Sequence, residues 1–299
     1  MGLRILQFGR SGQVGIELLA RGIARGHDIA AVGSDIVDLA QPERVPRAFS
    51  AAGSIDIVIN GAAYTAVDKA ESEPERANAV NGKAVGVLAE TCAKRGVPLI
   101  HLSTDYVFDG MKAGPYVETD ATAPLNAYGR SKLLGERLLA ERLDRHIIMR
   151  TSWVFSAHGA NFVKTMLRLG AERDALDIVD DQHGAPTSAG DIADACLAIC
   201  ERIVGQRAPR WGIYHFSSAG ETTWRRFAEA IFADAPWARL KARINPISTA
   251  EYKTPARRPL NSRLDCAKLA VEFGIVGRPW RVALDEVLIE LGRDKGALQ

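Results

Sequence analysis

The stretch Gly9-Arg10-Ser11-Gly12-Gln13-Val14-Gly15 follows directly on the apolar run Leu3–Phe8. Glycines at three-residue spacing predict a tight turn between a strand and a helix. Such a turn lets the backbone approach a diphosphate, and the helix that follows supplies free N–H groups and a favourable dipole. Strand, loop and helix together are the setting that a dinucleotide-binding loop requires. We therefore expect Gly9, Gly12 and Gly15 to bind the diphosphate of a cofactor.

Short apolar runs alternate with longer amphipathic runs on the carboxyl side of this loop. The segment Asp56-Ile57-Val58-Ile59-Asn60 has the continuous apolar run of a parallel strand buried on both faces. Strands that alternate with helices favour βαβ units and a parallel sheet. The predicted fold class is α/β, a Rossmann-type doubly wound parallel sheet. The expected strands are Leu3–Phe8, Asp28–Val32, Ile55–Asn60, Val97–Ser103 and His146–Thr151, and the expected helices are Gly15–Arg25, Glu75–Arg95 and Tyr128–Arg142.

The character of the chain changes after about Ser156. Helical stretches at Asn161–Gly170 and Thr223–Phe232 are joined by loops rich in Gly, Pro and Arg. We therefore expect a smaller, mixed α/β C-terminal domain that binds substrate. The predicted dinucleotide-binding domain is 1–155, with 187–205 returning to it, and the predicted substrate-binding domain is 156–186 together with 206–299.

Composition and charge exclude several classes of protein. The chain has 299 residues, 47% of them hydrophobic, and a formal net charge of +2. This balance gives no strong attraction to nucleic acid or to an anionic membrane, and no apolar run is long enough to span a bilayer. The N-terminus lacks the pattern of a signal peptide, so we expect a cytoplasmic protein. The four cysteines of the chain have no metal-binding spacing, and we expect them to be reduced. Cys196 and Cys200 are expected to face one core.

Tyr128 and Lys132 stand four residues apart in a predicted helix, which places both side chains on one face. A free tyrosine has a pKa of about 10, and an ammonium group nearby lowers it. The lysine can also hydrogen-bond the ribose of a nicotinamide cofactor. This pair therefore predicts a general acid, Tyr128, that protonates an alkoxide as hydride arrives.

A Tyr-x-x-x-Lys pair alone is common by chance, so its position carries the argument. It follows the strand Val97–Ser103, whose end reads Ser103-Thr104-Asp105-Tyr106. Ligands of a doubly wound sheet lie at the carboxyl ends of its strands. Thr104 would face the same crevice, where its hydroxyl could hydrogen-bond a substrate carbonyl. Thr104, Tyr128 and Lys132 together predict a reductase triad.

The choice between NADPH and NADH depends on the end of the second strand. Many NAD enzymes place an acidic residue there to bind the adenosine ribose hydroxyls. Here the strand ends Ala31-Val32-Gly33-Ser34, and Asp35 and Asp38 follow a little later. No carboxylate at the strand end would reject a 2′-phosphate, and Arg10 in the glycine loop would attract one. We expect NADPH or NADH as cofactor, with NADPH slightly favoured.

Seven stretches share the pattern of one known family. They are Gly9–Gly15 with Gln13, Thr65–Glu71, Ser103–Gly110, Pro124–Gly129, Arg150–Phe155, Asp181–Thr187 and Arg258–Ser262. Together they resemble the dTDP-4-dehydrorhamnose reductases, a family of extended short-chain dehydrogenases/reductases. The resemblance runs from the first strand nearly to the end of the chain. Its most specific parts are the Ser-Thr-Asp-Tyr run and the run from Asp-Gln to Pro-Thr.

The resemblance implies a reaction and a set of roles. The family reduces the C4 keto group of dTDP-4-dehydro-β-L-rhamnose to dTDP-β-L-rhamnose with NAD(P)H, for cell-surface polysaccharide such as lipopolysaccharide. Carried over, Tyr128 is the acid, Lys132 its activator and Thr104 the partner of the carbonyl. The positions that match contacts to the sugar nucleotide are Thr104, Asp105 and Trp153. The positions that match cofactor contacts are Gly12, Gln13, Val14, Asp38, Leu39, Ala63, Tyr64 and Thr65, beside Tyr128 and Lys132.

Two features of the family do not carry over directly. Some relatives have an acidic residue where this chain has Val32, so the cofactor preference stays open. Some relatives are described with magnesium, for which Glu17 and Glu290 are candidate carboxylates. Their spacing shows no ligand cluster, and we predict no metal site. Weaker substrate candidates are Gln182, Arg257 and Arg258, the arginines because a planar donor fork suits a diphosphate.

Two other functions compete with this reading. A related sugar-nucleotide reductase or epimerase would act on another sugar or nucleotide, and an epimerase would need acid-base residues beyond Tyr128, of which none is evident. A non-catalytic regulatory subunit of the methionine adenosyltransferase type resembles the same family and would act through a partner protein. The complete Ser103-Thr104-Asp105 run with Trp153 argues against that role. The expected partner is a sugar nucleotide, and a homodimer is a possible assembly, since many enzymes of this fold are dimers.

Overall fold

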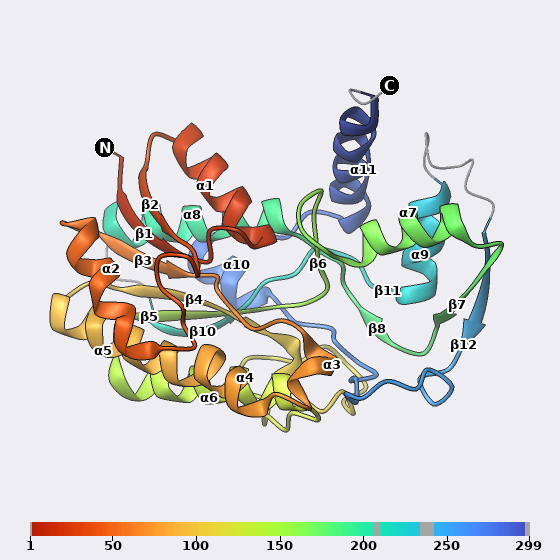
Figure 1. The fold of residues 1–299 in the computed structure, drawn as a ribbon, viewed down its shortest axis with the longest axis horizontal. Helices are drawn as coiled ribbons and strands as arrows, with labels where there is room; N and C mark the ends of the chain where they lie inside the picture. The colour runs from red at the N-terminus through yellow and green to blue at the C-terminus, as the bar shows by residue number, and fades with distance from the viewer. Residues whose placement is uncertain (1, 206–209, 234–241, 297–299) are drawn as a thin grey trace.

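A six-stranded parallel sheet lies at the centre of the computed structural model, which describes residues 2–205, 210–233 and 242–296. The strand order is β10-β5-β4-β3-β1-β2 (Figure 1). Because β1 pairs with β2 on one side and β3 on the other, the chain reverses its direction of winding at β1, where ligands of such sheets bind. The predicted Rossmann-type fold is confirmed. The strands are β1 (Arg4–Phe8), β2 (Asp28–Val32), β3 (Ile57–Asn60), β4 (Leu99–Thr104), β5 (His146–Thr151) and β10 (Gly212–His215).

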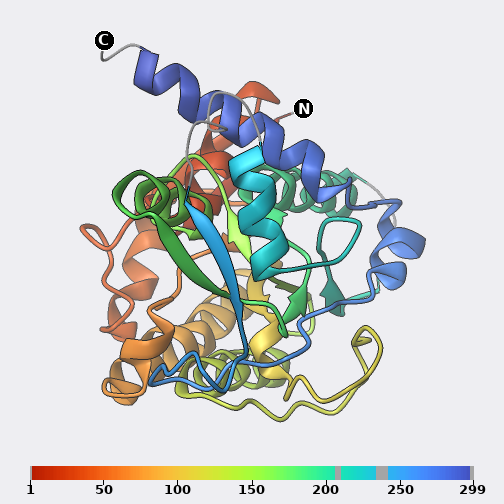
Figure 2. The ribbon, with the colours of Figure 1, turned by 90° about the vertical axis from the view of Figure 1, so that its right-hand side faces the viewer.

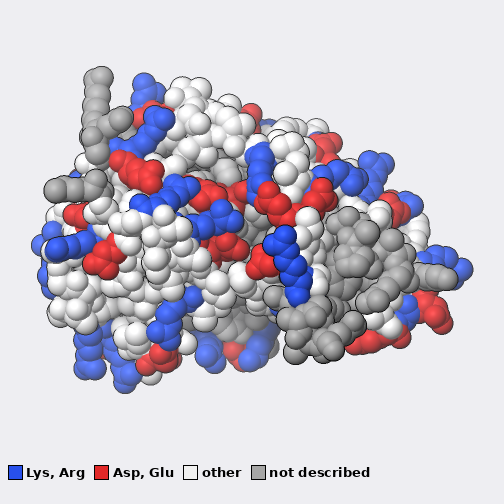
Figure 3. Space-filling model, turned by 90° about the horizontal axis from the view of Figure 1, so that it is seen from above, with Lys and Arg blue, Asp and Glu red and all other residues white. Residues whose placement is uncertain are grey.

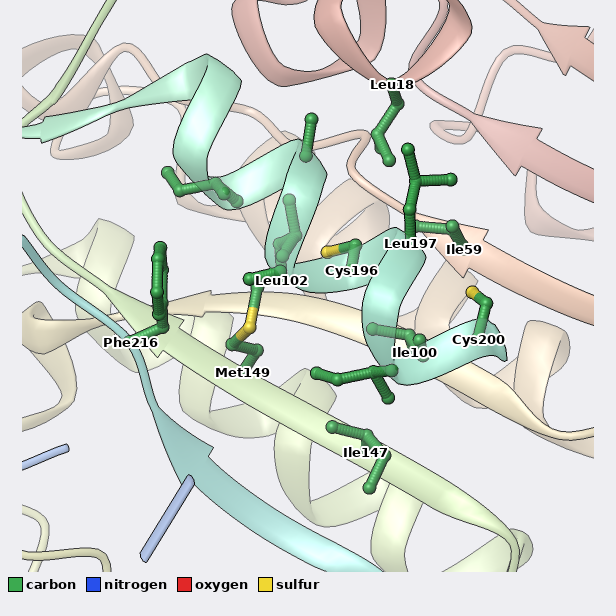
Figure 4. Packing of buried hydrophobic residues seen from close by; sticks show 14 of the residues in the cluster. Leu18, Ile59, Ile100, Leu102, Ile147, Met149, Cys196, Leu197, Cys200 and Phe216 are labelled. Atoms are coloured by element: carbon green, nitrogen blue, oxygen red, sulfur yellow. The ribbon is translucent and has the colours of Figure 1, made fainter. Parts of the chain in front are cut away.

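Helices cover both faces of this sheet. In Figure 4, Leu18 and the helix that carries Cys196 and Cys200 pack on strand residues such as Ile100. Both cysteines are buried free thiols in this one core, as predicted. The helices on this face are α1 (Gln13–Ala24), α8 (Ala189–Gly205) and α10 (Ala267–Phe273). Those on the opposite face are α2 (Val45–Ala52), α5 (Ala84–Arg95) and α6 (Ala127–Arg142).

Three consecutive pieces replace the single helix expected over Glu75–Arg95. They are α4 (Pro74–Asn78), the π-helical turn η2 (Ala79–Lys83) and α5. Asn81, buried in the π turn, accepts the backbone N–H of Tyr64 at 2.8 Å and donates to the Ser131 hydroxyl of α6 at 2.9 Å. The irregular turn thus lets one side chain join the loop after β3 to α6, a use typical of π-bulges. The remaining short helices here are η1 (Pro42–Arg44), α3 (Val67–Ala70) and η3 (Asp105–Val107).

A smaller hydrophobic core lies beside the main sheet. Phe155 and Phe227 are fully buried at its centre and Trp280 is nearly so. Figure 2 shows the helices and the parallel strand pair that surround this core. These elements are α7 (Phe162–Glu172), α9 (Trp224–Ala233), α11 (Trp280–Gly296), β7 (Ala175–Val179) and β12 (Arg243–Ile247). Two further strand pairs complete this part of the chain: β6 (Val154–Phe155) with β9 (Thr187–Ser188), and β8 (His183–Gly184) with β11 (Thr222–Thr223).

Two elements that follow residue 206 pack with the main sheet. β10 pairs in parallel with β5 at the edge of the main sheet, and α10 packs on the core under that sheet. Tyr214, from β10, is fully buried there, so this strand is part of the first unit. We propose that 1–155 and 187–205, with β10 and α10 added, form the cofactor-binding unit. The remainder of 156–186 and 206–299 would then form the substrate-binding unit.

Charges of both signs are mixed on the molecular face seen in Figure 3. Ion pairs join two of the helices: Arg21 of α1, and Arg25 directly after it, each pair with Asp194 of α8, at 2.6 and 2.7 Å. Exposed pairs of this kind contribute little to stability. Among the described residues, no helix is long and apolar enough to cross a membrane.

A buried ion pair between α6 and β5 distinguishes the core. Arg150 donates to both carboxylate oxygens of Glu136, at 2.6 to 3.2 Å, and the two side chains are only 2% and 4% exposed. Ser103 also donates to this carboxylate, at 2.5 Å. Removing one member of a buried pair leaves the other charge without compensation.

We predict that Arg150→Met lowers the free energy of unfolding by about 3–5 kcal/mol, measured by urea denaturation. The matched control is Arg168→Met, because the ion pair of Arg168 with Glu172 is 60% and 52% exposed. The control should change stability by about 0.5 kcal/mol or less. Equal effects of the two substitutions would contradict the role given to the buried pair.

Candidate active site

A cleft of ≈590 Å³ opens at the carboxyl ends of the central strands. Its size suits a small-molecule ligand. The structure brings eleven of the twelve predicted cofactor residues to its wall, all except Gly15, which lies behind the loop. They are Gly9, Gly12, Gln13, Val14, Asp38, Leu39, Ala63, Tyr64, Thr65, Tyr128 and Lys132. Segments far apart in the sequence therefore meet in one cleft, as the strand-end argument predicts.

The glycine loop is held by close backbone packing. Gly9 has φ +98°, and a Cβ there would lie 2.6 Å from the backbone nitrogen of Ala62. A Cβ on Gly15 would lie 1.7 Å from the carbonyl oxygen of Gly9. Only glycine therefore fits at this position in the first turn of α1. At Gly12 a Cβ would meet nothing nearer than 3.8 Å. Gly12 therefore leaves room in front of the helix N-terminus, where an anion is favoured.

Gln13 joins this loop to the segment that follows β6. Its side-chain oxygen accepts hydrogen bonds from the Ser156 hydroxyl and the Asn161 amide, both at 2.9 Å. Asn161 also caps α7, because its side-chain oxygen accepts the backbone N–H of Lys164. The first turn of α1 and the start of the second unit are thus linked at the mouth of the cleft.

Arg10 lies over the end of β2. It pairs with Asp35 at 2.9 Å, and both side chains are well exposed. A Cβ on Gly33 would lie 2.4 Å from the Asp35 carboxylate and 3.5 Å from the Arg10 guanidinium. Arg10, which the sequence suggested for a 2′-phosphate, is therefore paired with a neighbouring carboxylate beside the end of β2.

Lys132 extends from α6 to the floor of the cleft, where it is 2% exposed. Its side-chain nitrogen donates to the carbonyl oxygen of Leu102 at 2.7 Å and lies 3.3 Å from Nε2 of His101. Burial lowers its pKa to about 8, opposed by the carboxylate of Glu136. The start of α6 is fixed by Asn126, whose side chain accepts the N–H of Gly129 at 2.8 Å.

Tyr128 lies one turn before Lys132 and lines the cleft. Burial raises the pKa of Tyr128 to about 12, with a further rise from the Asp105 carboxylate, and a hydrogen bond with Thr104 opposes this. The pKa of Tyr128 is therefore raised and not lowered, because the phenol is desolvated and lies near the Asp105 carboxylate. The phenol remains protonated through neutral pH, which is the state a proton donor needs.

Thr104 is the last residue of β4 and Asp105 follows it; both are buried. The Thr104 hydroxyl donates to one carboxylate oxygen of Asp105 at 3.0 Å. The other carboxylate oxygen is buried without a hydrogen-bond partner among the described residues. Burial raises the pKa of Asp105 to about 6, although hydrogen bonds with Ser262 and Thr104 act against this. An unpaired buried oxygen of this kind is uncommon in folded proteins.

Trp153 follows β5 in an unusual backbone conformation. Its φ of 49° is the one positive value among non-glycine residues in the described part of the chain. The indole stacks on Trp224 at 3.7 Å, and a Cβ on Gly184 would lie 2.5 Å from the ring. Gln182, one of the weaker candidates, supports the stack because it accepts the indole N–H of Trp224 at 3.0 Å. Backbone strain held by such packing is frequent at functional sites.

The two arginines of the C-terminal segment differ in their surroundings. Arg258 binds the Asp68 carboxylate at 2.7 Å, so its charge is used to hold this segment against α3. Arg257 is exposed, and its carbonyl oxygen accepts the side-chain amide of Asn126 at 2.7 Å. Of the pair, Arg257 keeps the guanidinium that suits a diphosphate.

Magnesium does not fit the carboxylates suggested for it. Glu17 forms an ion pair with Arg21 at 2.8 Å, and both Glu17 and Glu290 face His158, at 3.5 and 3.8 Å. Within residues 2–205, 210–233 and 242–296, no group of three or more acidic, histidine or cysteine side chains could hold a metal ion.

Residue types and their spacing did not indicate the polar residues beneath the cleft or the second tryptophan beside it in the stack. Asn60 and His101 are fully buried on β3 and β4 and reach Lys132 from below. Two polar residues in otherwise apolar strands were the available signal, but their meeting depends on the register that pairs Asn60 with His101. Trp224 gave no local signal, because its partner Trp153 is 71 positions away.

Comparisons with known proteins agree on one family. The family model of the RmlD substrate binding domain matches residues 3–293. The chain is 48% identical to the dTDP-4-dehydrorhamnose reductase of Burkholderia thailandensis over 294 residues, covering 94% of this chain and 97% of that protein. The crystal structure of a dTDP-4-dehydrorhamnose reductase from Clostridium acetobutylicum has a TM-score of 0.90 at 32% identity, covering 97% of this chain and 100% of that one.

The dTDP-4-dehydrorhamnose reductase of Bacillus anthracis, solved in complex with NADP, has a TM-score of 0.89 at 33% identity and the same coverage of 97% and 100%. The family matches and the cleft formed by the glycine loop, Tyr128 and Lys132 lead to the same assignment. The chain belongs to the dTDP-4-dehydrorhamnose reductase family of oxidoreductases.

Proposed function

We propose that this chain reduces the C4 keto group of dTDP-4-dehydro-β-L-rhamnose to dTDP-β-L-rhamnose, with NADPH or NADH as the hydride donor. The observation that carries the proposal is the meeting of Tyr128 and Lys132 with the glycine loop in one cleft. The relatives named as dTDP-4-dehydrorhamnose reductases support the substrate, and the relative solved with NADP supports the cofactor.

The cleft residues fit a dinucleotide. Gly12 leaves space before the N-terminus of α1, where a diphosphate would lie, and the small residues Ala62 and Ala63 line the wall after β3. Arg10 lies beside the end of β2, where the 2′-phosphate of the adenosine ribose would bind. Lys132 would bind the nicotinamide ribose. Bound in this cleft, NADPH or NADH supplies the hydride.

Tyr128 would supply the proton. Its phenol keeps the proton at neutral pH because burial raises the pKa of Tyr128 to about 12. As negative charge develops on the substrate carbonyl oxygen, that oxygen becomes the stronger base and takes the proton. The Lys132 ammonium then lies one helical turn from the phenolate that remains and stabilises it.

Thr104, Asp105 and Trp153 would bind the sugar. The Thr104 hydroxyl is close enough to Tyr128 for a hydrogen bond and would direct the carbonyl towards the phenol. The free carboxylate oxygen of Asp105 would accept a sugar hydroxyl. Trp153, fixed by its stack on Trp224, would form a wall of the site.

Removal of the phenolic oxygen tests the proton donor. Tyr128→Phe should lower kcat for NADPH oxidation with the 4-keto sugar nucleotide by roughly 10²–10⁴-fold, the usual contribution of general acid catalysis. Its Kd for NADPH should stay close to that of the unsubstituted protein. Tyr116→Phe is the control, because Tyr116 stacks on Phe108 and binds Asp109 outside the cleft. Turnover by Tyr128→Phe at the control's rate would refute the proposed role.

Replacement of Lys132 tests the contact to the ribose. Lys132→Ala should weaken NADPH binding and also lower kcat, because one ammonium group serves both the cofactor and the phenolate. Binding is measured by the fluorescence of the bound nucleotide and turnover by the loss of absorbance at ~340 nm, where the reduced nicotinamide absorbs. An unchanged Kd for NADPH would remove the ribose contact from the account.

The cofactor preference depends on Arg10. Arg10→Met should lower kcat/KM with NADPH by about tenfold or more, the worth of a hydrogen bond to a charged group. It should leave kcat/KM with NADH nearly unchanged, because NADH has no 2′-phosphate. The matched variant Asp35→Asn frees Arg10 from its ion pair and should favour NADPH further. Equal losses with both nucleotides after Arg10→Met would show that Arg10 does not read the 2′-phosphate.

A further inference from the structure

Three buried polar side chains form a row beneath the cleft, from β3 through β4 to α6. Asn60 and His101 have no exposed surface, and Lys132 is 2% exposed. The amide nitrogen of Asn60 lies 3.0 Å from Nδ1 of His101, and Nε2 of the same ring lies 3.3 Å from the lysine nitrogen. Buried polar groups of this kind are normally hydrogen-bonded to one another.

The orientation of the Asn60 amide is fixed at its other end. The backbone N–H of Ala62 donates to the side-chain oxygen of Asn60 at 3.1 Å. The NH₂ group therefore faces His101 and donates to Nδ1. A neutral imidazole that accepts at Nδ1 carries its proton on Nε2. The ring consequently presents an N–H to Lys132.

His101 stays neutral in this position. Burial and the charge of Lys132 hold the pKa of His101 well below its usual range, and a smaller effect of His146 acts in the same direction. The backbone carbonyl of Asn60 acts in the opposite direction but does not outweigh them. The neutral ring therefore carries its one proton on Nε2, because Asn60 donates to Nδ1.

The two protonation states of Lys132 differ in how they fit this N–H. A neutral amine can donate to the Leu102 carbonyl and accept the Nε2 proton with its lone pair. An ammonium has no lone pair, and one of its protons would oppose the Nε2 proton. The arrangement favours the amine over the ammonium.

We propose that His101 is a positioning residue that sets the pH at which Lys132 is charged, through an N–H that Asn60 keeps pointed at the lysine. This inference rests on the proposed function, in which the Lys132 ammonium binds the cofactor ribose and stabilises the Tyr128 phenolate. The Asn60 side chain also accepts the backbone N–H of Ala62, which lies in the loop after β3. The row therefore connects this loop to Lys132.

The charge of Lys132 also responds to its other neighbours. Burial lowers its pKa to about 8, and the Glu136 carboxylate opposes this, although Glu136 is itself neutralised by Arg150. The titratable and charged groups that face this region are Tyr128 and Glu136 on α6, His101 on β4, Asp105 after β4, and His146 and Arg150 on β5. His101 is the one among them within hydrogen-bond distance of the lysine nitrogen.

The sign of the pH effect follows directly. Lys132 is charged below its pKa, so functions of the ammonium are present at lower pH and lost as the pH rises through about 8. A substitution that removes the opposing N–H should move this loss to higher pH. In His101→Gln the side-chain amide reaches the place of Nε2 and can turn its oxygen towards the ammonium.

The experiment measures the Kd of NADPH by nucleotide fluorescence as a function of pH, with no sugar present. We expect binding by the unsubstituted protein to weaken above about pH 8, and the midpoint to rise by about one pH unit in His101→Gln, a tenfold gain in proton affinity. His101→Leu removes the N–H but adds an apolar neighbour that favours the amine, so it should move the midpoint less than His101→Gln does. His146→Gln replaces another buried histidine and should leave it unchanged.

A midpoint that falls or stays fixed in both His101 variants would overturn the inference, because His101 would then accept from the ammonium or not influence it. NADPH binding without pH dependence in the unsubstituted protein would also overturn it. Failure of the 4-keto sugar to react, with the upward shift intact, would remove the proposed substrate and leave the role of His101 standing.

Discussion

The side-chain nitrogen of Lys132 lies 2.7 Å from the carbonyl oxygen of Leu102. Lys132 lies at the floor of the cleft and is 2% exposed. A buried amine without hydrogen-bond partners would be costly, and the Leu102 carbonyl of β4 supplies a partner where α6 packs on the sheet. This contact fixes the rotation of α6. Tyr128, one turn earlier on the same face, is then directed to the edge of the sheet where β1, β3 and β4 also end.

The glycine loop supplies the other half of the site. Gly15 lets α1 approach the Gly9 carbonyl, and Gln13 in the first turn binds Ser156 and Asn161 of the second unit. The glycine loop and the start of α7 are therefore held by the same turn. Trp153, which has a φ of 49°, is held after β5 by its stack on Trp224.

Features encoded by local sequence were the ones that could be predicted. The glycine spacing, the apolar strands and the Tyr128–Lys132 pair each follow from short-range rules, and the structure collects eleven of the predicted cofactor residues in one cleft. The row from Asn60 to His101 could not be predicted in this way, because it requires the register of β3 on β4. The same limit applies to the π turn at Asn81 and to β10, which joins the main sheet from the second half of the chain.

The raised pKa of Tyr128 shows why residue types alone do not determine chemistry. An adjacent lysine argued for a lowered value, yet burial and Asp105 raise the pKa of the phenol to about 12. A donor that keeps its proton until an alkoxide forms is suited to reduction. It also limits exchange with water while the carbonyl is being reduced.

The direct test of the central claim is the fate of the transferred hydride. NADPH carrying deuterium at the nicotinamide C4 is incubated with dTDP-4-dehydro-β-L-rhamnose and the protein, and the product is examined by NMR. The account predicts dTDP-β-L-rhamnose with deuterium at C4 of the sugar. Oxidation of NADPH without deuterium at that carbon, or no product despite bound NADPH, would contradict it.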